Sequence, residues 1–169
     1  DTVVVKQGTY NEQISFGGRK ITVRSDNPND PATVQNTVIT ADSNAGVVFD
    51  FGETEESVLA GFTITGAGIV CIGASPTLRG NTIRDCAGVG IKGQDYAKPT
   101  ILGNQILDNT LEGIHSCDGL IQGNTISGNL AGIADCDGSI LDNTISHNAN
   151  AGGLYSCSGE IAEIGRAHV

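Results

Sequence analysis

A phrase of about 20 residues, a length typical of solenoid repeats, recurs along the second half of the chain. Its central copy reads GNTISGNLAGIADCDG, from Gly123 to Gly138, and related copies lie at residues 76–93, 99–119 and 139–159. The first Asn of each copy stands at Asn81, Asn104, Asn124 and Asn143, at spacings of 23, 20 and 19 residues. In a solenoid, each repeat buries its apolar face only against its neighbours in the stack.

Each copy carries three isolated apolar residues, which are too widely spaced to form one helical stripe. The residues between them are mainly Thr, Ser, Asn and Gly, which form caps and turns. Three short strands joined by tight corners fit this spacing, and stacking would place equivalent strands about 4.8 Å apart. The predicted buried columns are Leu78, Ile101, Ile121 and Ile140; Ile83, Ile106, Ile126 and Ile145; and Ile91, Ile114, Ile133 and Leu154.

Asn recurs at two positions of each coil, and we expect it to form ladders at the corners. Asn tolerates left-handed backbone, and a buried amide can bond the Asn one coil away, so that no amide is left unpaired. A direct role of these amides in ligand binding is the alternative. The first predicted ladder is Asn81, Asn104, Asn124 and Asn143; the second is Asn109, Asn129 and Asn148, with Cys86 in the same position one coil earlier.

The phrase GNTI…N…GI resembles the right-handed parallel β-helix repeat family, within the pectin-lyase-like superfamily, over about Val58 to Ile161. The first residues, DTVVVKQGTYNEQISFGGRKITVRS, look like the amino-terminal coil of secreted bacterial members. The resemblance implies an all-β, single-stranded right-handed parallel β-helix, in agreement with the three short strands per coil. The Ile, Val and Leu columns give roughly seven coils and, at the strand spacing, a rod about 34 Å long. The resemblance also implies an extracellular or cell-surface location.

We divide the predicted β-helix domain, residues 1–162, into irregular amino-terminal coils (1–56) and regular repeats (57–162). The amino-terminal part alternates strand-like runs with segments rich in Gly, Pro, Asn and acidic residues. Expected strands are Thr2–Val5, Gln13–Phe16, Lys20–Arg24, Thr37–Thr40 and Gly46–Phe51. Expected turns and loops are Gly8–Tyr10, Asp26–Ala32 and an acidic surface loop at Gly52–Glu56.

The two ends of the sequence suggest a piece of a longer protein. The chain holds no Met and opens directly on a strand-like run, whereas the repeat pattern is lost after Ile161. The segment EIGRAHV, Glu163 to Val169, looks like a translated sequencing-library adapter, so we expect a non-native tail at residues 163–169; a natural frayed terminus is the alternative. Poor packing of this tail would leave Ile140, Ile145 and Leu154 partly uncovered.

Five Cys residues need an explanation. Cys117, Cys136 and Cys157 recur at spacings of 19 and 21, Cys71 lies near their column, and Cys86 stands in an Asn column. In-register side chains on adjacent coils keep their Cβ atoms about 4.8 Å apart, beyond the usual disulfide range of about 3.5–4.5 Å. We therefore expect buried, reduced thiols, with a soft-metal site on three Cys as the alternative. Cys136 is three positions after Ile133, so strict alternation would put the two on opposite faces, and a bulge or a corner must lie between them.

The outward column beside the third apolar column is the candidate ligand-binding surface. It reads Lys92, His115, Ala134 and Tyr155, of which Lys92, His115 and Tyr155 are the candidate contacts. One His beside a Tyr and a Lys is not the carboxylate pair that glycoside hydrolysis requires. The other outward positions inspected also lack a carboxylate: Thr82, Gln105, Thr125 and Thr144, with Arg84, Leu107, Ser127 and Ser146. No catalytic residue is predicted.

Paired carboxylates occur at matching turns instead. Asp118 and Asp137 occupy equivalent Cys-Asp-Gly turns, and Asp85 and Asp108 precede the second Asn ladder. Like charges one coil apart repel unless they are solvated or share a cation. Solvated turns are the simpler interpretation; if a cofactor binds at all, we expect Ca²⁺ at Asp118 and Asp137.

The charge balance limits the classes of partner. A formal net charge of −10 argues against nucleic acid and anionic membrane. No apolar run is long enough to insert into a bilayer. A polysaccharide partner is compatible with these properties. Two functions stay open: a non-catalytic module of a secreted or surface protein, which binds carbohydrate or serves as a stalk, and a fragment of a polysaccharide-acting lyase, hydrolase or epimerase whose catalytic coils are missing.

Overall fold

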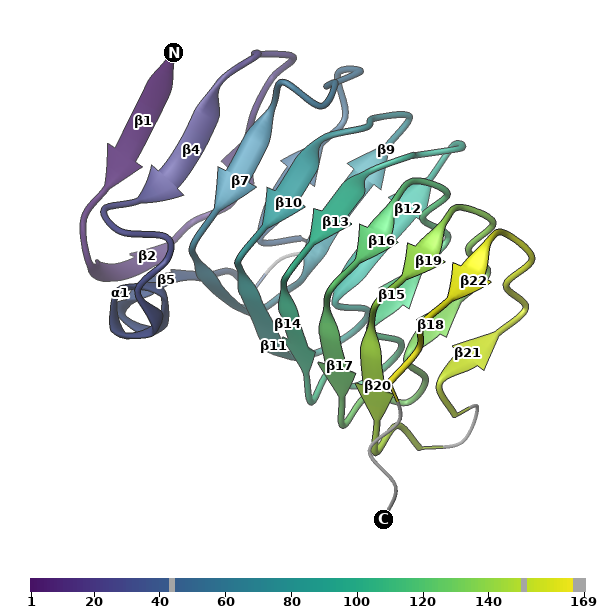
Figure 1. Ribbon diagram of the computed structural model, residues 1–169. Helices are drawn as coiled ribbons and strands as arrows, with labels where there is room; N and C mark the ends of the chain where they lie inside the picture. The colour runs from purple at the N-terminus through teal and green to yellow at the C-terminus, as the bar shows by residue number, and fades with distance from the viewer. Residues whose placement is uncertain (43–44, 150–151, 166–169) are drawn as a thin grey trace.

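The computed structural model describes residues 1–42, 45–149 and 152–165 and forms a parallel β-solenoid (Figure 1). The chain winds through three parallel sheets in turn, and each coil adds one strand to each sheet. About seven coils are stacked from the purple amino-terminal end to the yellow carboxyl-terminal end. The predicted all-β solenoid of three short strands per coil is confirmed.

The three sheets are called A, B and C in the order in which a coil visits them. Sheet A contains β1 Thr2–Val5, β4 Thr22–Ser25, β7 Val58–Ala60, β10 Thr77–Arg79, β13 Thr100–Leu102, β16 Ile121–Gln122, β19 Ile140–Leu141 and β22 Ile161–Ala162. Sheet B contains β2 Gly8–Asn11, β5 Thr37–Thr40, β8 Thr63–Gly66, β11 Thr82–Cys86, β14 Gln105–Leu107, β17 Thr125–Ser127 and β20 Thr144–Ser146. Sheet C contains β3 Ile14–Ser15, β6 Val47–Phe49, β9 Ile69–Ile72, β12 Ile91–Gln94, β15 Ile114–His115, β18 Ile133–Ala134 and β21 Leu154–Tyr155.

The core is a set of in-register apolar ladders. In sheet B, Ile83 pairs with Ile106, which pairs with Ile126 and then Ile145 in successive coils. Each of these four side chains is at most 3% exposed. In the wider first coils, the rings of Phe16 and Phe49 fill the interior, with their centroids 4.4 Å apart. The predicted apolar columns are therefore the actual core of the solenoid.

Two expectations for residues 1–42 are wrong. The expected turn at Gly8–Tyr10 lies in strand β2, because Thr9 and Tyr10 pair in register with Val38 and Ile39 of β5. The expected loop at Asp26–Ala32 ends in a short helix, α1 Pro31–Asn36. Asp30 caps this helix by accepting a hydrogen bond from the Thr33 N–H at 2.9 Å, and a Pro in the first turn costs no hydrogen bond there.

In the regular repeats, each coil turns at three corners that use residues in the left-handed region. Left-handed backbone costs little for Gly and is tolerated by Asn and Asp. The first corner uses Gly80, Gly103, Gly123 and Asp142; the second uses Asp85, Asp108, Gly128 and His147; the third uses Gly73, the pair Asp95 and Tyr96, Ser116, Asp135 and Ser156. The third corner, at Asp135, is the irregularity expected between Ile133 and Cys136.

In the two Asn ladders, the residue after the left-handed position points inward, and its side chain accepts a hydrogen bond from the previous coil. At the first corner, the Asn104 N–H donates to Asn124 Oδ1 at 2.8 Å, and the Asn124 N–H donates to Asn143 Oδ1 at 2.9 Å. At the second corner, the Asn109 N–H donates to Asn129 Oδ1 at 3.0 Å. Every such acceptor comes from the following coil, so the two Asn ladders satisfy corner N–H groups that no strand can reach.

At the third corner, the Glu53 side chain accepts backbone N–H groups as the Asn side chains do, and Glu53 is not part of a surface loop. Its side chain is only 3% exposed. Its Oε1 accepts the Gly18 N–H of the preceding coil at 2.9 Å, and Oε2 accepts the Phe51 N–H at 3.0 Å. The expectation of a solvated acidic loop is therefore wrong at this residue, because two backbone donors compensate the burial of its carboxylate.

The last described coil covers the core better than the sequence suggests. Ile140 is fully buried and Ile145 is 3% exposed, so the expectation that both are partly uncovered is wrong. The reason is that Ile161 pairs with Ile140, and Gly165 bridges Thr144. Leu154 is half-buried, as expected. The remaining tail residues, 166–169, lie outside the described part of the chain.

Ile126 offers a direct test of the core ladder. Truncation of Ile126 to Ala should lower the free energy of unfolding by about 2–5 kcal/mol, the usual cost of a buried aliphatic truncation. Its neighbour Thr125 is exposed on the same strand, so Thr125→Ala should cost no more than about 0.5 kcal/mol. Denaturant unfolding of both variants measures this difference, and equal losses would contradict the assignment of the two faces.

Asn124 tests the corner ladder. Asn124→Ala removes the acceptor of the Asn104 N–H and the donor to the Ile101 carbonyl. Each unpaired buried group costs about 1–3 kcal/mol, so the free energy of unfolding should fall by more than about 2 kcal/mol. Asn148 is only half-buried, and Asn148→Ala should cost less because water reaches the groups it leaves. Thermal or denaturant melts that rank the two variants in the opposite order would contradict this role.

Candidate functional site

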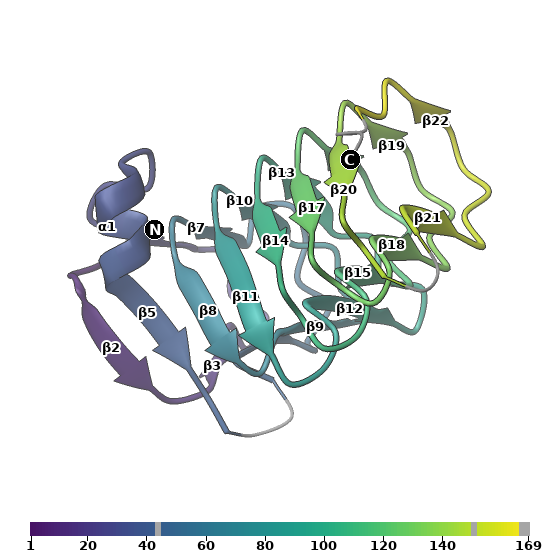
Figure 2. The same cartoon turned by 90° about the horizontal axis from the view of Figure 1, so that it is seen from below.

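A groove of about 530 Å³ lies between α1 and the outer face of sheet B. Its wall comes from α1 and the loop before it, and its floor comes from β8, β11, β14 and the corners that precede them. In Figure 2, α1 stands beside the start of β5, and the strands of sheet B continue from it toward the carboxyl-terminal coils. The lining residues are Pro28, Asn29, Pro31, Val34, Gln35, Thr63, Gly80, Asn81, Thr82, Arg84, Gly103, Gln105 and Leu107.

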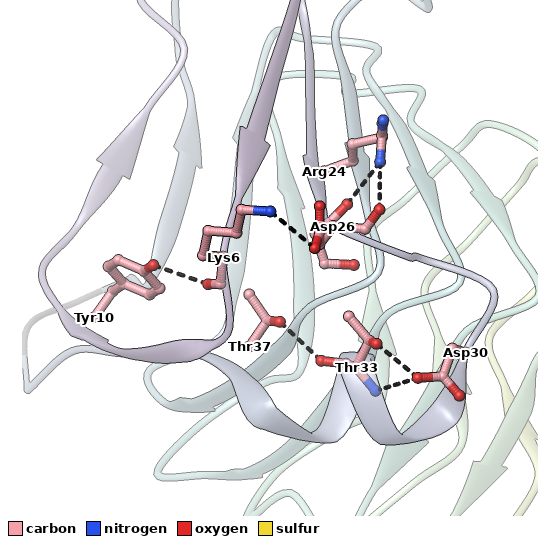
Figure 3. Close-up of polar contacts among 8 residues, drawn as sticks. Lys6, Tyr10, Arg24, Asp26, Asp30, Thr33 and Thr37 are labelled. Atoms are coloured by element: carbon pink, nitrogen blue, oxygen red, sulfur yellow. Dashed lines mark hydrogen bonds and ion pairs between the residues drawn. The ribbon is translucent and has the colours of Figure 1, made fainter.

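Hydrogen bonds fix α1 to the sheet. Asp30 Oδ2 accepts from both the Thr33 N–H and the Thr33 hydroxyl, at 2.9 and 2.6 Å (Figure 3). The Thr37 hydroxyl of β5 donates to the Thr33 carbonyl at 2.7 Å, and the Thr63 hydroxyl of β8 donates to the Val34 carbonyl at 2.9 Å. The Thr63 bond therefore ties the helix to the floor of the groove, and the Asp30 and Thr37 bonds fix the two ends of the helix itself.

Polar contacts and a close backbone approach also hold the loop that leads into α1. Lys6 Nζ lies 3.0 Å from Asp26 Oδ2, and Arg24 Nη1 donates to the Asp26 carbonyl at 2.8 Å (Figure 3). Pro28 packs on Gly61, where an added Cβ would come within 2.4 Å of the proline ring. Only Gly fits at position 61, and this close approach brings the loop down to the edge of the groove.

The floor presents polar side chains at the period of the coils. Thr63, Thr82 and Gln105 pair in register on consecutive strands and point outward. Arg84 and Leu107 form the neighbouring outward column, and Gly80 and Gly103 leave the corner free of side chains. Beyond the groove the columns continue with hydroxyl groups: Thr125, Thr144, Ser127 and Ser146.

The chemistry of the groove is that of hydrogen bonding rather than acid–base catalysis. Its lining contains hydroxyl, amide and guanidinium groups and no carboxylate. Arg84 is its one ionic side chain, and one guanidinium nitrogen lies 2.6 Å from the adjacent Asp85. The outward columns of this floor were predicted to lack carboxylates, whereas the helical wall was not predicted from the sequence. The capping residue Asp30 and Pro31 were the signal that could have found it.

The predicted ligand column is in register on sheet C. Lys92 pairs with His115, which pairs with Ala134 and then Tyr155. Lys92 and His115 are half-buried, whereas Tyr155 is exposed. Lys92 lines a second groove of about 370 Å³, which neither His115 nor Tyr155 reaches. His115 instead contacts Ser116 and Asp135, two residues that the sequence analysis did not connect with it.

The Asp118 and Asp137 turns are bonded to one another. Asp118 Oδ1 accepts the Asp137 N–H at 3.0 Å, and Asp137 Oδ1 accepts the Ser158 hydroxyl. Within residues 1–42, 45–149 and 152–165, no group of three or more His, Cys, Asp or Glu side chains is placed to hold a metal ion. Ca²⁺ normally takes six to eight oxygen ligands, and these turns supply two carboxylates. Calcium at Asp118 and Asp137 stays a prediction.

The cysteines are free thiols, and Cys117, Cys136 and Cys157 occupy the third corner. The Cys117 N–H donates to Cys136 Sγ at 3.2 Å, as corner N–H groups elsewhere donate to Asn. Burial raises the pKa of Cys71 and Cys117 well above the usual thiol value, and it raises the pKa of Cys86 to about 12. These three thiols are therefore protonated at neutral pH.

Cys157 differs because it is half-exposed. A hydrogen bond from the Cys136 thiol stabilises its thiolate and lowers the pKa of Cys157 to about 7. Alkylation by iodoacetamide should therefore occur mainly at Cys157, at a rate that rises as the pH passes through about 7. Mass spectrometry after pulses of reagent at a series of pH values measures this, and Cys136→Ala, which removes the donor, should shift the profile to higher pH. Faster labelling of Cys117 in the folded protein would contradict the assignment.

A known protein family matches the chain. Among the described residues, no helix has the length and apolar character needed to cross a membrane. No curated protein and no solved structure matched the chain. A family model described as a right-handed β-helix region matches residues 16–165, which is most of the sequence. With its parallel three-sheet coils and corner ladders, the chain belongs to the right-handed β-helix family.

Proposed function

We propose that the chain is a carbohydrate-binding β-helix module and that the groove beside α1 is its binding site. The observation that carries this proposal is the outward column of sheet B, where Thr82 and Gln105 on the floor of the groove continue in register with Thr125 and Thr144 along the solenoid axis. Coils repeat about every 4.8 Å, close to the length of one sugar in an extended glycan. A glycan lying along this axis would meet a new polar side chain at each sugar.

The groove favours an uncharged, hydroxyl-rich glycan. Apolar patches at Pro31, Val34 and Leu107 suit the carbon faces of sugar rings, and the hydroxyl and amide groups suit their oxygens. A polyanion would meet a chain of net charge −10, and Arg84 already contacts Asp85. The proposal includes an extracellular or cell-surface location, which rests on the resemblance of the repeats to secreted β-helix proteins.

A binding module is favoured over a polysaccharide-acting fragment because the groove has no pair of carboxylates. Glycoside hydrolysis commonly uses two of them about 5–10 Å apart, and none lines this groove. A structural stalk without ligand is the remaining outcome, since a solenoid also serves as a spacer. The sheet C column of Lys92, His115 and Tyr155 stays a second predicted contact surface.

Affinity electrophoresis and titration calorimetry against neutral and acidic polysaccharides test the proposal. We expect a neutral glycan to bind, and Gln105→Ala to weaken binding on the order of tenfold, the loss of about one hydrogen bond. Lys98→Ala is the control, because Lys98 is exposed and lies outside the groove lining. Tyr155→Ala examines the sheet C column in the same assay.

The results of these assays distinguish a binding module from a stalk, from a site on sheet C and from an enzyme. Failure of every glycan to bind would contradict the proposal and favour the stalk. Weaker binding by Tyr155→Ala with no effect of Gln105→Ala would move the site to sheet C. The appearance of new reducing ends or unsaturated sugars would show that the chain is an enzyme.

A further inference from the structure

Three side chains at the third corner, where strands of sheet C end, form a chain of polar contacts. Ser116 Oγ lies 2.8 Å from His115 Nδ1, and Asp135 Oδ2 lies 3.2 Å from His115 Nε2. Ser116 follows His115 directly, and Asp135 comes from the next coil. A nucleophile, a base and a group that orients the base are thus within contact distance, which is the arrangement of an activated hydroxyl.

The corners of the solenoid bring these groups together. Ser116 and Asp135 are the left-handed residues of the third corner in adjacent coils. Their backbones are fixed, because the Ser116 N–H donates to the Ala134 carbonyl and the Asp135 N–H donates to the Tyr155 carbonyl, each at 3.0 Å. The His115 and Asp135 side chains keep 29% and 48% of their surface exposed, so a substrate can approach from solvent.

We propose that Ser116, His115 and Asp135 form a hydrolytic site for small carboxylic esters. This activity goes beyond glycan binding and does not rest on it, because none of the three residues lines the groove beside α1. The carboxylate of Asp135 can only accept, so its contact assigns the imidazole proton to Nε2. Nδ1 is then the acceptor for the Ser116 hydroxyl, as a general base requires.

The chemistry balances with water as the only co-reactant. Ser116 Oγ forms a bond to the ester carbonyl carbon while its proton passes to His115 Nδ1. The tetrahedral intermediate collapses, the bond to the alkoxide breaks, and Nδ1–H protonates the leaving alcohol. Water, deprotonated by His115, then attacks the acyl carbonyl carbon; the bond to Ser116 Oγ breaks, His115 returns the proton to Ser116, and the carboxylic acid leaves. Asp135 stabilises the imidazolium in both steps and stays ionised.

The solenoid contains its own control for this site. Ser156 occupies the same left-handed corner position, but Tyr155 precedes it in place of a histidine. The two serines share a backbone conformation and differ in the presence of a base. Any reactivity that depends on the proposed chemistry must therefore occur at Ser116 and not at Ser156.

A fluorophosphonate probe tests the proposal on the unmodified protein. The probe phosphonylates activated serine hydroxyls, and peptide mapping by mass spectrometry identifies the residue. We expect the label at Ser116, together with slow hydrolysis of p-nitrophenyl acetate that Ser116→Ala abolishes. His115→Gln should slow labelling on the order of 100-fold, the contribution of a general base. Ser156→Ala should label like the unmodified protein.

Asp135 acts through His115, so its test needs a spectroscopic measurement. Asp135→Asn should slow labelling and move the imidazole proton from Nε2 to Nδ1, because the amide can donate to Nε2. Nitrogen-15 NMR of His115 reports this tautomer change, which a purely structural effect would not produce. Absence of label at Ser116 in the unmodified protein, equal label at Ser156, or an unchanged rate in His115→Gln would each overturn the proposal.

Discussion

The backbone N–H groups at the corners are the constraint on which this solenoid depends. Strand pairing satisfies the backbone within the sheets, but each tight corner turns a peptide group toward the interior, where an unpaired donor is costly. The chain meets this requirement with a side-chain acceptor from the following coil: Asn124 for Asn104, Asn129 for Asn109, and Cys136 for Cys117. Beside the buried Ile columns, these corner positions are therefore where the repeat has least freedom to change.

The fold was predictable from the sequence because each coil is encoded by a short pattern of apolar and Asn residues, and this pattern is repeated. The Ile83 column and the first Asn ladder recur at nearly constant spacing, so each copy supports the interpretation of the others. The amino-terminal coils lack this support. The sequence of Gly8–Tyr10 is typical of a turn, and only its pairing with β5 shows that it is a strand. Glu53 was predicted to be solvated because its two backbone donors are distant from it or not evident in the sequence.

The sites were harder to predict because they depend on where the corners fall. His115 and Asp135 are 20 residues apart, and their contact requires Asp135 to adopt the left-handed corner conformation that directs its side chain back along the edge of sheet C. Left-handed residues here include Gly, Asp, Ser, His and Tyr, so residue type alone does not mark them. The groove likewise depends on α1, whose capping residue stands in a segment with two prolines.

The ladders also have a direction. An Asn of one coil receives its acceptor from the coil after it, so a coil at the growing end of a nascent chain carries corner donors that nothing yet satisfies. Its last polar groups are paired only when about 20 more residues, one solenoid period, have been synthesised. As the chain grows from the amino-terminal end, each new coil would supply the acceptors for the corner N–H groups of the coil before it. Only the corner N–H groups of the newest coil would then be unpaired. Folding on the ribosome therefore suits this molecule better than collapse of the whole chain at once.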